Sequence, residues 1–263
     1  MNYKNILFDI SDGIATLTLN RPDKLNSFTA EMHGEVRLAL EQVAADRSAR
    51  VLVLTGAGRG FCAGQDLGDR AVAPGGAPVD LGESVEKYYA PLVLSLRALP
   101  MPVICAVNGV AAGAGANIAL ACDIVIAARS ASFNEVFCKL GLIPDTGGTY
   151  FLPRLIGSAR ATGLAMLGDR LSAERAEQWG LIWKCVDDAA LAGEVAALAR
   201  HFATAPTLGL ARAKQALQAS GLNTLEQQLA LEAGMMRELG YTEDYREGVS
   251  AFMEKRSPAF KGK

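Results

Sequence analysis

The chain of 263 residues is half hydrophobic, and its 26 basic and 28 acidic residues leave a net charge of −2. This composition favours a substantial folded core, and the balanced charge argues against nucleic acid or an anionic membrane surface as a partner. Five cysteines, an odd total without a C-x-x-C pair, argue against a disulfide framework or a zinc site, and no apolar run is long enough to cross a bilayer. We therefore expect a cytoplasmic protein.

The chain opens with a predicted β-hairpin. Residues 6–10 and 14–19 are rich in strand-forming side chains and flank a Ser-Asp-Gly turn signal. Thr29 can cap the helix that follows, which carries apolar residues at helical spacing. The run 51–54, Val-Leu-Val-Leu, then indicates a buried strand, so the helix would form a crossover.

A second unit repeats this order. Residues 88–99 have a helical pattern, residues 102–107 have a strand pattern, and small residues from Gly113 open another helix before a strand at 124–127. Strands that alternate with helices predict an α/β fold with parallel sheets and right-handed crossovers.

The last third of the chain is predicted to be helical. It has almost no strand signal, and its clearest helical patterns lie at 173–179, 191–202 and 225–239. Earlier in the chain, the loop 71–81 is rich in Gly, Pro and Ala. We expect this loop to be mobile and able to close over a bound substrate.

Three segments carry the predicted chemistry: Phe-Cys-Ala-Gly-Gln-Asp at 61–66, Gly-Ala-Gly-Ala-Asn at 113–117 and Ile-Pro-Asp-Thr-Gly-Gly at 143–148. Small residues let a ligand approach the main chain, and a helix that starts there aims unpaired N–H groups at negative charge. With one acid nearby, these segments predict an oxyanion hole and a base.

Two other interpretations of the glycines stay open. Gly56 begins a glycine-rich loop after a strand, which could bind a dinucleotide, but the last glycine of G-x-G-x-x-G is replaced by Phe61. The run from Gly113 fails the same test because Ile118 takes that position. Gly113 and Gly115 could also serve helix packing alone.

These segments resemble the enoyl-CoA hydratase/isomerase (crotonase) superfamily, and the resemblance runs from Leu-Asn-Arg-Pro at 19–22 to Phe-Met-Glu-Lys-Arg at 252–256. It implies a crotonase-like repeated ββα superhelix with a C-terminal helical region. Residues 1–195 would form the core with the acyl-CoA site, and residues 196–263 would form a helical trimerisation region. A homotrimer or homohexamer is the implied assembly.

Within the superfamily, residues 108–116 and 141–145 look most like the ring-epoxide isomerases of phenylacetate breakdown. The implied reaction converts 1,2-epoxyphenylacetyl-CoA to its oxepin isomer, with 3-enoyl to 2-enoyl-CoA isomerisation as a related activity. An enoyl-CoA hydratase and a noncatalytic CoA-binding subunit are the alternatives.

The resemblance assigns the oxyanion donors to the backbone N–H groups of Gln65 and Ala114, and the proton-transferring acid to Asp145. Hydratases of the superfamily use two glutamates, and here Asn117 and Phe137 stand at their positions. Hydration is therefore the weaker hypothesis. Asp145 could instead be a turn residue that caps the next helix. Glu135 is the nearest rival acid, and we expect it to be exposed or salt-bridged.

Several further residues are expected to contact the substrate or its CoA moiety, although solvent exposure or core packing is the ordinary role of such lysines and phenylalanines. Asp66 is also expected to hold its own loop in place. We expect no cofactor, since CoA is part of the substrate, and no metal, since the two histidines are isolated. The predicted contact residues are Lys24, Ala63, Asp66, Leu67, Asn117, Phe137, Lys255 and Phe260.

Overall fold

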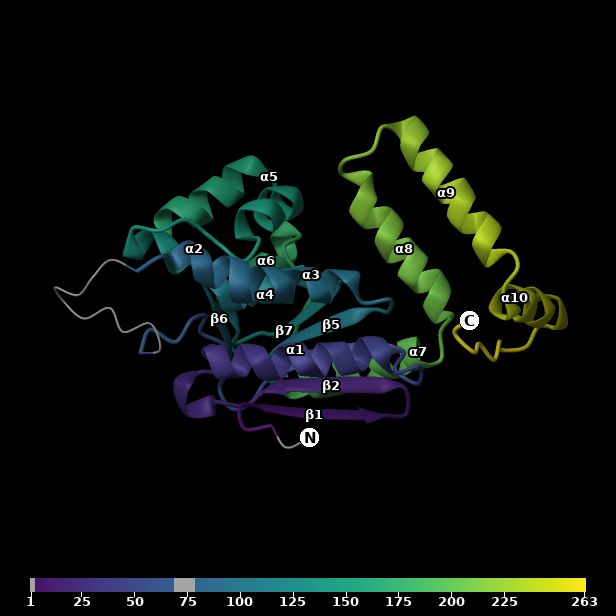
Figure 1. Ribbon diagram of the computed structural model, residues 1–263, viewed down its shortest axis with the longest axis horizontal. Helices are drawn as coiled ribbons and strands as arrows, with labels where there is room; N and C mark the ends of the chain where they lie inside the picture. The colour runs from purple at the N-terminus through teal and green to yellow at the C-terminus, as the bar shows by residue number, and fades with distance from the viewer. Residues whose placement is uncertain (1–2, 69–78) are drawn as a thin grey trace.

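A computed structural model describes residues 3–68 and 79–263, so most of the 71–81 loop falls outside the described residues (Figure 1). The core contains a six-stranded sheet in the order β1-β2-β3-β5-β7-β10, in which β1 is antiparallel to β2 and the other pairs are parallel. Its strands are β1 (Ile6–Ser11), β2 (Ile14–Leu19), β3 (Val51–Gly56), β5 (Val103–Val107), β7 (Ile124–Ala128) and β10 (Lys184–Val186).

A second, four-stranded sheet has the order β4-β6-β8-β9. Each of its first three strands directly follows a strand of the larger sheet, and a helical segment comes next in the chain. This repeat is the predicted ββα superhelix, which is confirmed. The strands are β4 (Gly60–Cys62), β6 (Val110–Ala112), β8 (Ser132–Asn134) and β9 (Arg170–Ser172).

The sequence predictions for the N-terminal part are confirmed. The hairpin forms between β1 and β2, and Thr29 caps α1 (Ala30–Ala45) by accepting a hydrogen bond from the Met32 amide at 3.2 Å. All five residues of β5 are buried, which explains why the sequence shows an unbroken apolar run rather than an alternating one.

The helix predicted at 88–99 begins earlier in the structure. Asp80 caps α2 (Leu81–Ser84) through hydrogen bonds from the amides of Gly82 and Glu83. A π-helical turn, η2 (Val85–Tyr89), then leads into α3 (Ala90–Ala98). Such wide turns are rare and often occur at functional sites.

The remaining helices match the predicted helical character of the C-terminal third, although β9 and β10 are short strands that the sequence did not predict. The α5 helix bends at Gly157, which has a φ of 75°. The helices are α4 (Ala114–Ala121), α5 (Gly148–Leu167), α6 (Ala173–Trp179), α7 (Leu191–Ala203), α8 (Thr207–Ser220), α9 (Leu225–Leu239) and α10 (Glu243–Glu254), with short turns η1 (Pro22–Lys24), η3 (Val136–Leu140) and η4 (Asp188–Ala190).

The C-terminal helices do not separate from the core directly after α7, because Lys214 of α8 pairs with Asp123 at 2.8 Å and Gln218 of α8 donates to the Arg97 carbonyl at 3.2 Å. The predicted boundary at residue 195 lies inside α7, which contacts β3, β5 and β7 of the large sheet. The α8, α9 and α10 helices project to one side of the molecule (Figure 1). The division at residue 195 and the trimerisation role of the region beyond it therefore stay predictions.

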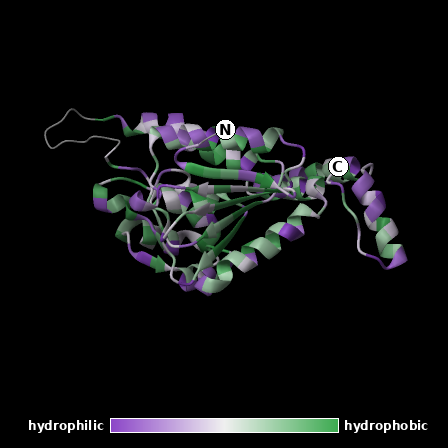
Figure 2. Cartoon of the chain, turned by 90° about the horizontal axis from the view of Figure 1, so that it is seen from below, coloured by the Kyte–Doolittle hydropathy of each residue, from purple (hydrophilic) through white to green (hydrophobic). Residues whose placement is uncertain are grey.

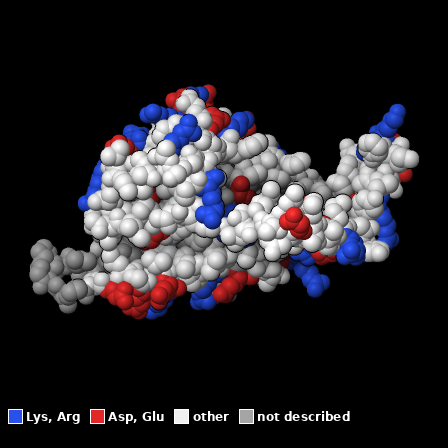
Figure 3. Space-filling model, turned by 90° about the horizontal axis from the view of Figure 1, so that it is seen from above, with Lys and Arg blue, Asp and Glu red and all other residues white. Residues whose placement is uncertain are grey.

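The surface has a mixed character. Hydrophobic strands lie inside the core, and the helices around it carry both polar and apolar residues (Figure 2). Acidic and basic side chains are interspersed on the face shown in Figure 3. Among the helices of the described residues, none combines the length and apolar character needed to cross a bilayer.

Candidate functional site

The three segments singled out in the sequence meet around one cavity of about 140 Å³. Apolar side chains form most of its wall, and Asp145 is the one acid among the residues that line it. Six of the predicted site residues are thereby brought together. The lining residues are Ala63, Gly64, Gln65, Leu67, Tyr89, Gly113, Ala114, Val136, Phe137, Leu140, Leu142 and Asp145.

The first predicted donor, the N–H of Gln65, points away from Phe28, the residue that pairs with this segment. The Phe28 amide donates to the Gly64 carbonyl at 2.7 Å, and the Asp66 amide donates to the Phe28 carbonyl at 2.9 Å. Because the C=O and the N–H of one trans peptide point in opposite directions, and the Gly64 carbonyl points to Phe28, the N–H of Gln65 is directed to the side opposite Phe28. The residue itself lines the cavity.

The second predicted donor, the N–H of Ala114, is the first amide of α4. The first amides of a helix have no intrahelical partner, and they carry the positive end of the helix dipole. Gly113 precedes it with a φ of 53°, and its amide donates to the Asn134 carbonyl at 2.8 Å. This bond fixes the start of α4 against β8.

Two glycines allow the donor segments to touch. A Cβ atom on Gly64 would lie 2.9 Å from the Ala112 oxygen and 3.4 Å from the Ala114 nitrogen, and Gly64 has a φ of 88°. A Cβ atom on Gly115 would lie 2.3 Å from the Cys62 oxygen. Larger residues would push the two segments apart, so close contact between them requires glycine at both positions.

Asp145 reaches the cavity from the turn before α5. Its side chain accepts a hydrogen bond from the Thr146 hydroxyl at 2.7 Å, and its carbonyl accepts from the Asn117 side-chain amide at 3.0 Å and from the Gly148 amide at 2.8 Å. The residue at the N-cap of α5 is Gly147 rather than Asp145. One acidic residue thus lines a cavity that both predicted donor residues also line, and such a set suits proton transfer beside a polarised carbonyl.

The expectation for Glu135 is wrong. Its side chain is buried, with 3% of the residue exposed, and it accepts a hydrogen bond from Asn117 at 3.4 Å instead of pairing with a cation. Burial raises the pKa of Glu135 to about 7; the Asn117 hydrogen bond opposes this rise and the charge of Asp145 adds to it. Asn117 is itself fully buried and does not line the cavity, so its predicted substrate contact stays a prediction.

Sequence reasoning missed Tyr89 as a site residue. The side chain is buried at the end of the π-helical turn and lines the cavity. Its hydroxyl donates to the Gln65 side-chain oxygen at 2.9 Å, while the Gln65 side-chain nitrogen donates to the Phe28 carbonyl at 3.1 Å. The adjacent aromatic pair at 88–89 was the available signal, but the contact with Gln65 depends on the fold.

Asp66 ties down its loop, as predicted. It accepts hydrogen bonds from the Arg21 guanidinium at 2.9 Å and from the Gly68 amide at 3.0 Å. Burial raises its pKa, but these bonds and the charges of Arg21 and Lys24 outweigh that effect and hold the pKa of Asp66 below its usual value. Lys24 is exposed, and it lies close enough to Asp66 for its positive charge to lower the pKa of that carboxyl group.

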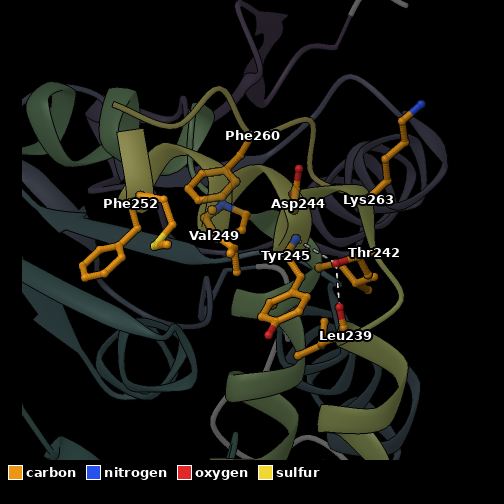
Figure 4. Close-up of a pocket in the computed structure, with 13 residues that line it drawn as sticks. Leu239, Thr242, Asp244, Tyr245, Val249, Phe252, Phe260 and Lys263 are labelled. Atoms are coloured by element: carbon orange, nitrogen blue, oxygen red, sulfur yellow. Dashed lines mark hydrogen bonds between the residues drawn. The ribbon is translucent and has the colours of Figure 1, made fainter. Parts of the chain in front are cut away.

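The other two predicted contacts lie elsewhere. Lys255 ends α10, and Phe260 lines a separate cavity of about 400 Å³ among the C-terminal helices (Figure 4). In Figure 1, α10 lies at the right-hand end of the molecule, away from β6 and α4 nearer its middle. Within one chain, the structure does not bring Lys255 and Phe260 to Asp145.

Comparison with known proteins identifies the family of the chain. The family model described as enoyl-CoA hydratase/isomerase matches residues 9–263. The 1,2-epoxyphenylacetyl-CoA isomerase of Escherichia coli is 61% identical over 98% of both chains, and a probable enoyl-CoA hydratase of Rhodobacter capsulatus is 47% identical over 100% of both. The crystal structure of an enoyl-CoA hydratase from Bacillus anthracis superimposes with a TM-score of 0.90 at 35% identity, covering 99% of this chain and 100% of that one. The predicted membership is confirmed: the chain belongs to the enoyl-CoA hydratase/isomerase family.

Proposed function

We propose that this protein is an acyl-CoA isomerase that converts 1,2-epoxyphenylacetyl-CoA to its oxepin-CoA isomer, with 3-enoyl to 2-enoyl-CoA isomerisation as a related activity. The single observation that carries the proposal is that Asp145 is the one acid among the residues lining a cavity that Gln65 and Ala114 also line. The 61% identity to the Escherichia coli epoxide isomerase supports the choice of acyl group.

In this mechanism, the two main-chain amides hold the thioester oxygen and stabilise negative charge that develops on it. Asp145 takes a proton from one position of the acyl group and returns it to another, or assists opening of the epoxide, so substrate and product have the same atoms. A single carboxylate suffices for such a shuttle. Phe137 gives the cavity an apolar wall at the position where hydratases carry an acid, which disfavours the activation of water.

The test is a product analysis with the ring epoxide, a 3-enoyl-CoA and a 2-enoyl-CoA, by liquid chromatography, which separates isomers of equal mass, followed by mass spectrometry. We expect the first two substrates to give products of unchanged mass. A product heavier by one water from the 2-enoyl-CoA would instead support a hydratase. Binding of all three thioesters without turnover would support the noncatalytic CoA-binding subunit.

We also propose that the chain assembles as a homotrimer or homohexamer through the projecting helices. Apolar side chains on α10 are largely solvent-exposed in the single chain, including Phe252 at 82% and Met253 at 76%. Together with Phe260 they border the C-terminal cavity (Figure 4). Exposed apolar surface of this kind marks interaction sites.

Replacing Phe252 with Glu should shift the protein toward the monomer, because a charge would then have to be buried in the interface. Light scattering coupled to size-exclusion chromatography measures the mass directly. The matched control is Leu7→Glu, which places the same charge on an exposed apolar position of the edge strand β1. An unchanged mass for Phe252→Glu would contradict assembly through this surface.

A further inference from the structure

A buried acid lies behind the candidate site, and the proposed reaction does not use it. Glu135 follows β8, is 3% exposed and is not among the residues that line the cavity. A buried carboxylate is costly unless a cation or several hydrogen-bond donors compensate its charge. Among the described residues, the charged group that acts on Glu135 is another acid, Asp145.

The other neighbours of Glu135 do not compensate a negative charge on its carboxyl group. From α4 it meets the neutral amide of Asn117. Gly168, at the end of α5, lies close to the main-chain oxygen of Glu135. The side chains of Cys138 and Lys139 lie next to the same glycine. Lys139 therefore lies near the Glu135 main chain, and none of the ion pairs found among the described residues joins it to the carboxyl group.

Asn117 links this acid to the catalytic turn. Its side-chain nitrogen donates to a Glu135 carboxyl oxygen at 3.4 Å and to the Asp145 carbonyl at 3.0 Å. The carbonyl can only accept, so the amide must present its nitrogen to the turn. A Cβ atom on Gly148 would lie 2.4 Å from that nitrogen, which shows how closely the start of α5 rests on the amide.

The side-chain amide of Asn117 also has an unused acceptor oxygen, to which a protonated carboxylic acid can donate a hydrogen bond. The side-chain oxygen of Asn117 is buried and has no hydrogen-bond partner among the described residues. A buried acceptor without a donor is costly. Protonated Glu135 carries an O–H group next to this amide, whereas ionised Glu135 offers only acceptors.

We propose that Glu135 is a positioning residue for Asp145, which in its neutral form holds Asn117 against the Asp145 carbonyl and on ionisation releases that contact. The inference rests on the proposed function, in which Asp145 transfers a proton. An ionised Glu135 is a stronger acceptor, so it draws the Asn117 nitrogen away from the turn, and it also repels the Asp145 carboxylate. Small displacements of a reacting group have large effects on rate.

The pH range of this release follows from the burial of Glu135, which raises its pKa to about 7. Turnover should therefore be high while Glu135 is protonated and fall as the pH rises through neutrality. A single ionisation near this pH predicts that kcat falls about tenfold between roughly pH 6 and pH 8, with little change in KM.

The rate experiment compares the wild type with Glu135→Gln, using exchange of the α-protons of phenylacetyl-CoA with solvent deuterium. We expect Glu135→Gln to keep the wild-type kcat of pH 6 at both pH values, because a neutral amide cannot ionise. Glu135→Met should also be independent of pH, but with a lower kcat, because it cannot bond to Asn117. The control Glu232→Gln removes an exposed acid on α9 and should keep the wild-type profile.

A melting series tests the ionisation without any substrate. Because the folded state favours protonated Glu135, its contribution to stability is fully present below the ordinary glutamate pKa and is lost as the pH rises toward about 7. Glu135→Gln should therefore melt at a progressively higher temperature than the wild type over this range, by roughly 5–10 °C at the plateau.

Three results would overturn the positioning role of Glu135. A wild-type kcat that is independent of pH across this range, or a Glu135→Gln variant that keeps the alkaline fall, would overturn it. So would a folded Glu135→Gln variant that is inactive at pH 6. Absence of exchange in the wild type at every pH would refute proton transfer by Asp145 and with it the positioning role, but not the epoxide isomerisation, which the product analysis tests; a pH-dependent melting difference would still identify Glu135 as the group that ionises.

Discussion

Replacing Asp145 with Asn should lower kcat by roughly 10²- to 10⁴-fold while leaving the affinity for a CoA thioester within about twofold. Asparagine preserves the size of the side chain but cannot accept and return a proton. The main-chain bonds to the Asp145 carbonyl do not involve the side chain, so the turn should keep its shape. Steady-state isomerisation of a 3-enoyl-CoA gives kcat, and calorimetric titration with phenylacetyl-CoA gives the affinity.

The control for this experiment is Asp169→Asn, which neutralises an exposed acid at the end of α5. It should leave both quantities unchanged, since a solvated charge at that place does not face the cavity. A variant at Asp145 that kept turnover within tenfold of the wild type, at unchanged binding, would show that another group moves the proton. Loss of binding together with turnover would point to a structural role instead.

Local sequence signals were sufficient for most strands of the large sheet and for most helices, whereas the ββα superhelix with its second sheet followed only from the family resemblance. The β5 strand is buried on both faces, so its apolar run is continuous and easily recognised. The α9 helix begins with a capping box formed by Thr224 and Gln227, and its predicted bounds match those observed. In contrast, β9 and β10 have three residues each and exist because they pair with β8 and β7, which no pattern within such short runs can indicate.

The site was only partly predictable for the same reason. Gln65, Ala114 and Asp145 belong to short motifs, so the resemblance located them and the structure brought them to one cavity. Glu135 was expected to be exposed or salt-bridged because the family resemblance implies that it points away from the two donors. Its burial depends on contacts from α4 and on the approach of Gly168, and these are distant in sequence.

Replacing Gly64 with Ala should reduce kcat by roughly 10²- to 10³-fold, the effect expected when one oxyanion-hole donor is displaced. Gly64 has a φ of 88°, which alanine rarely adopts, and the added methyl group would lie 2.9 Å from the Ala112 oxygen. The segment that carries the Gln65 amide must then move away from α4. Since the thioester oxygen needs both donors at once, a shift of either segment weakens stabilisation of the enolate more than it weakens ground-state binding.

The comparison that separates this effect from a loss of folding is Gly163→Ala. Gly163 lies within α5 with open space around its Cα, so alanine there should be tolerated and should favour the helix. Far-UV circular dichroism and melting establish that both variants are folded before kcat is measured. If folded Gly64→Ala kept the wild-type kcat, the Gln65 amide would not be a donor to the oxyanion. A reduced kcat with unchanged KM would instead show that contact between the two glycine-rich segments serves the transition state, because only an interaction stronger there than in the bound substrate changes kcat alone.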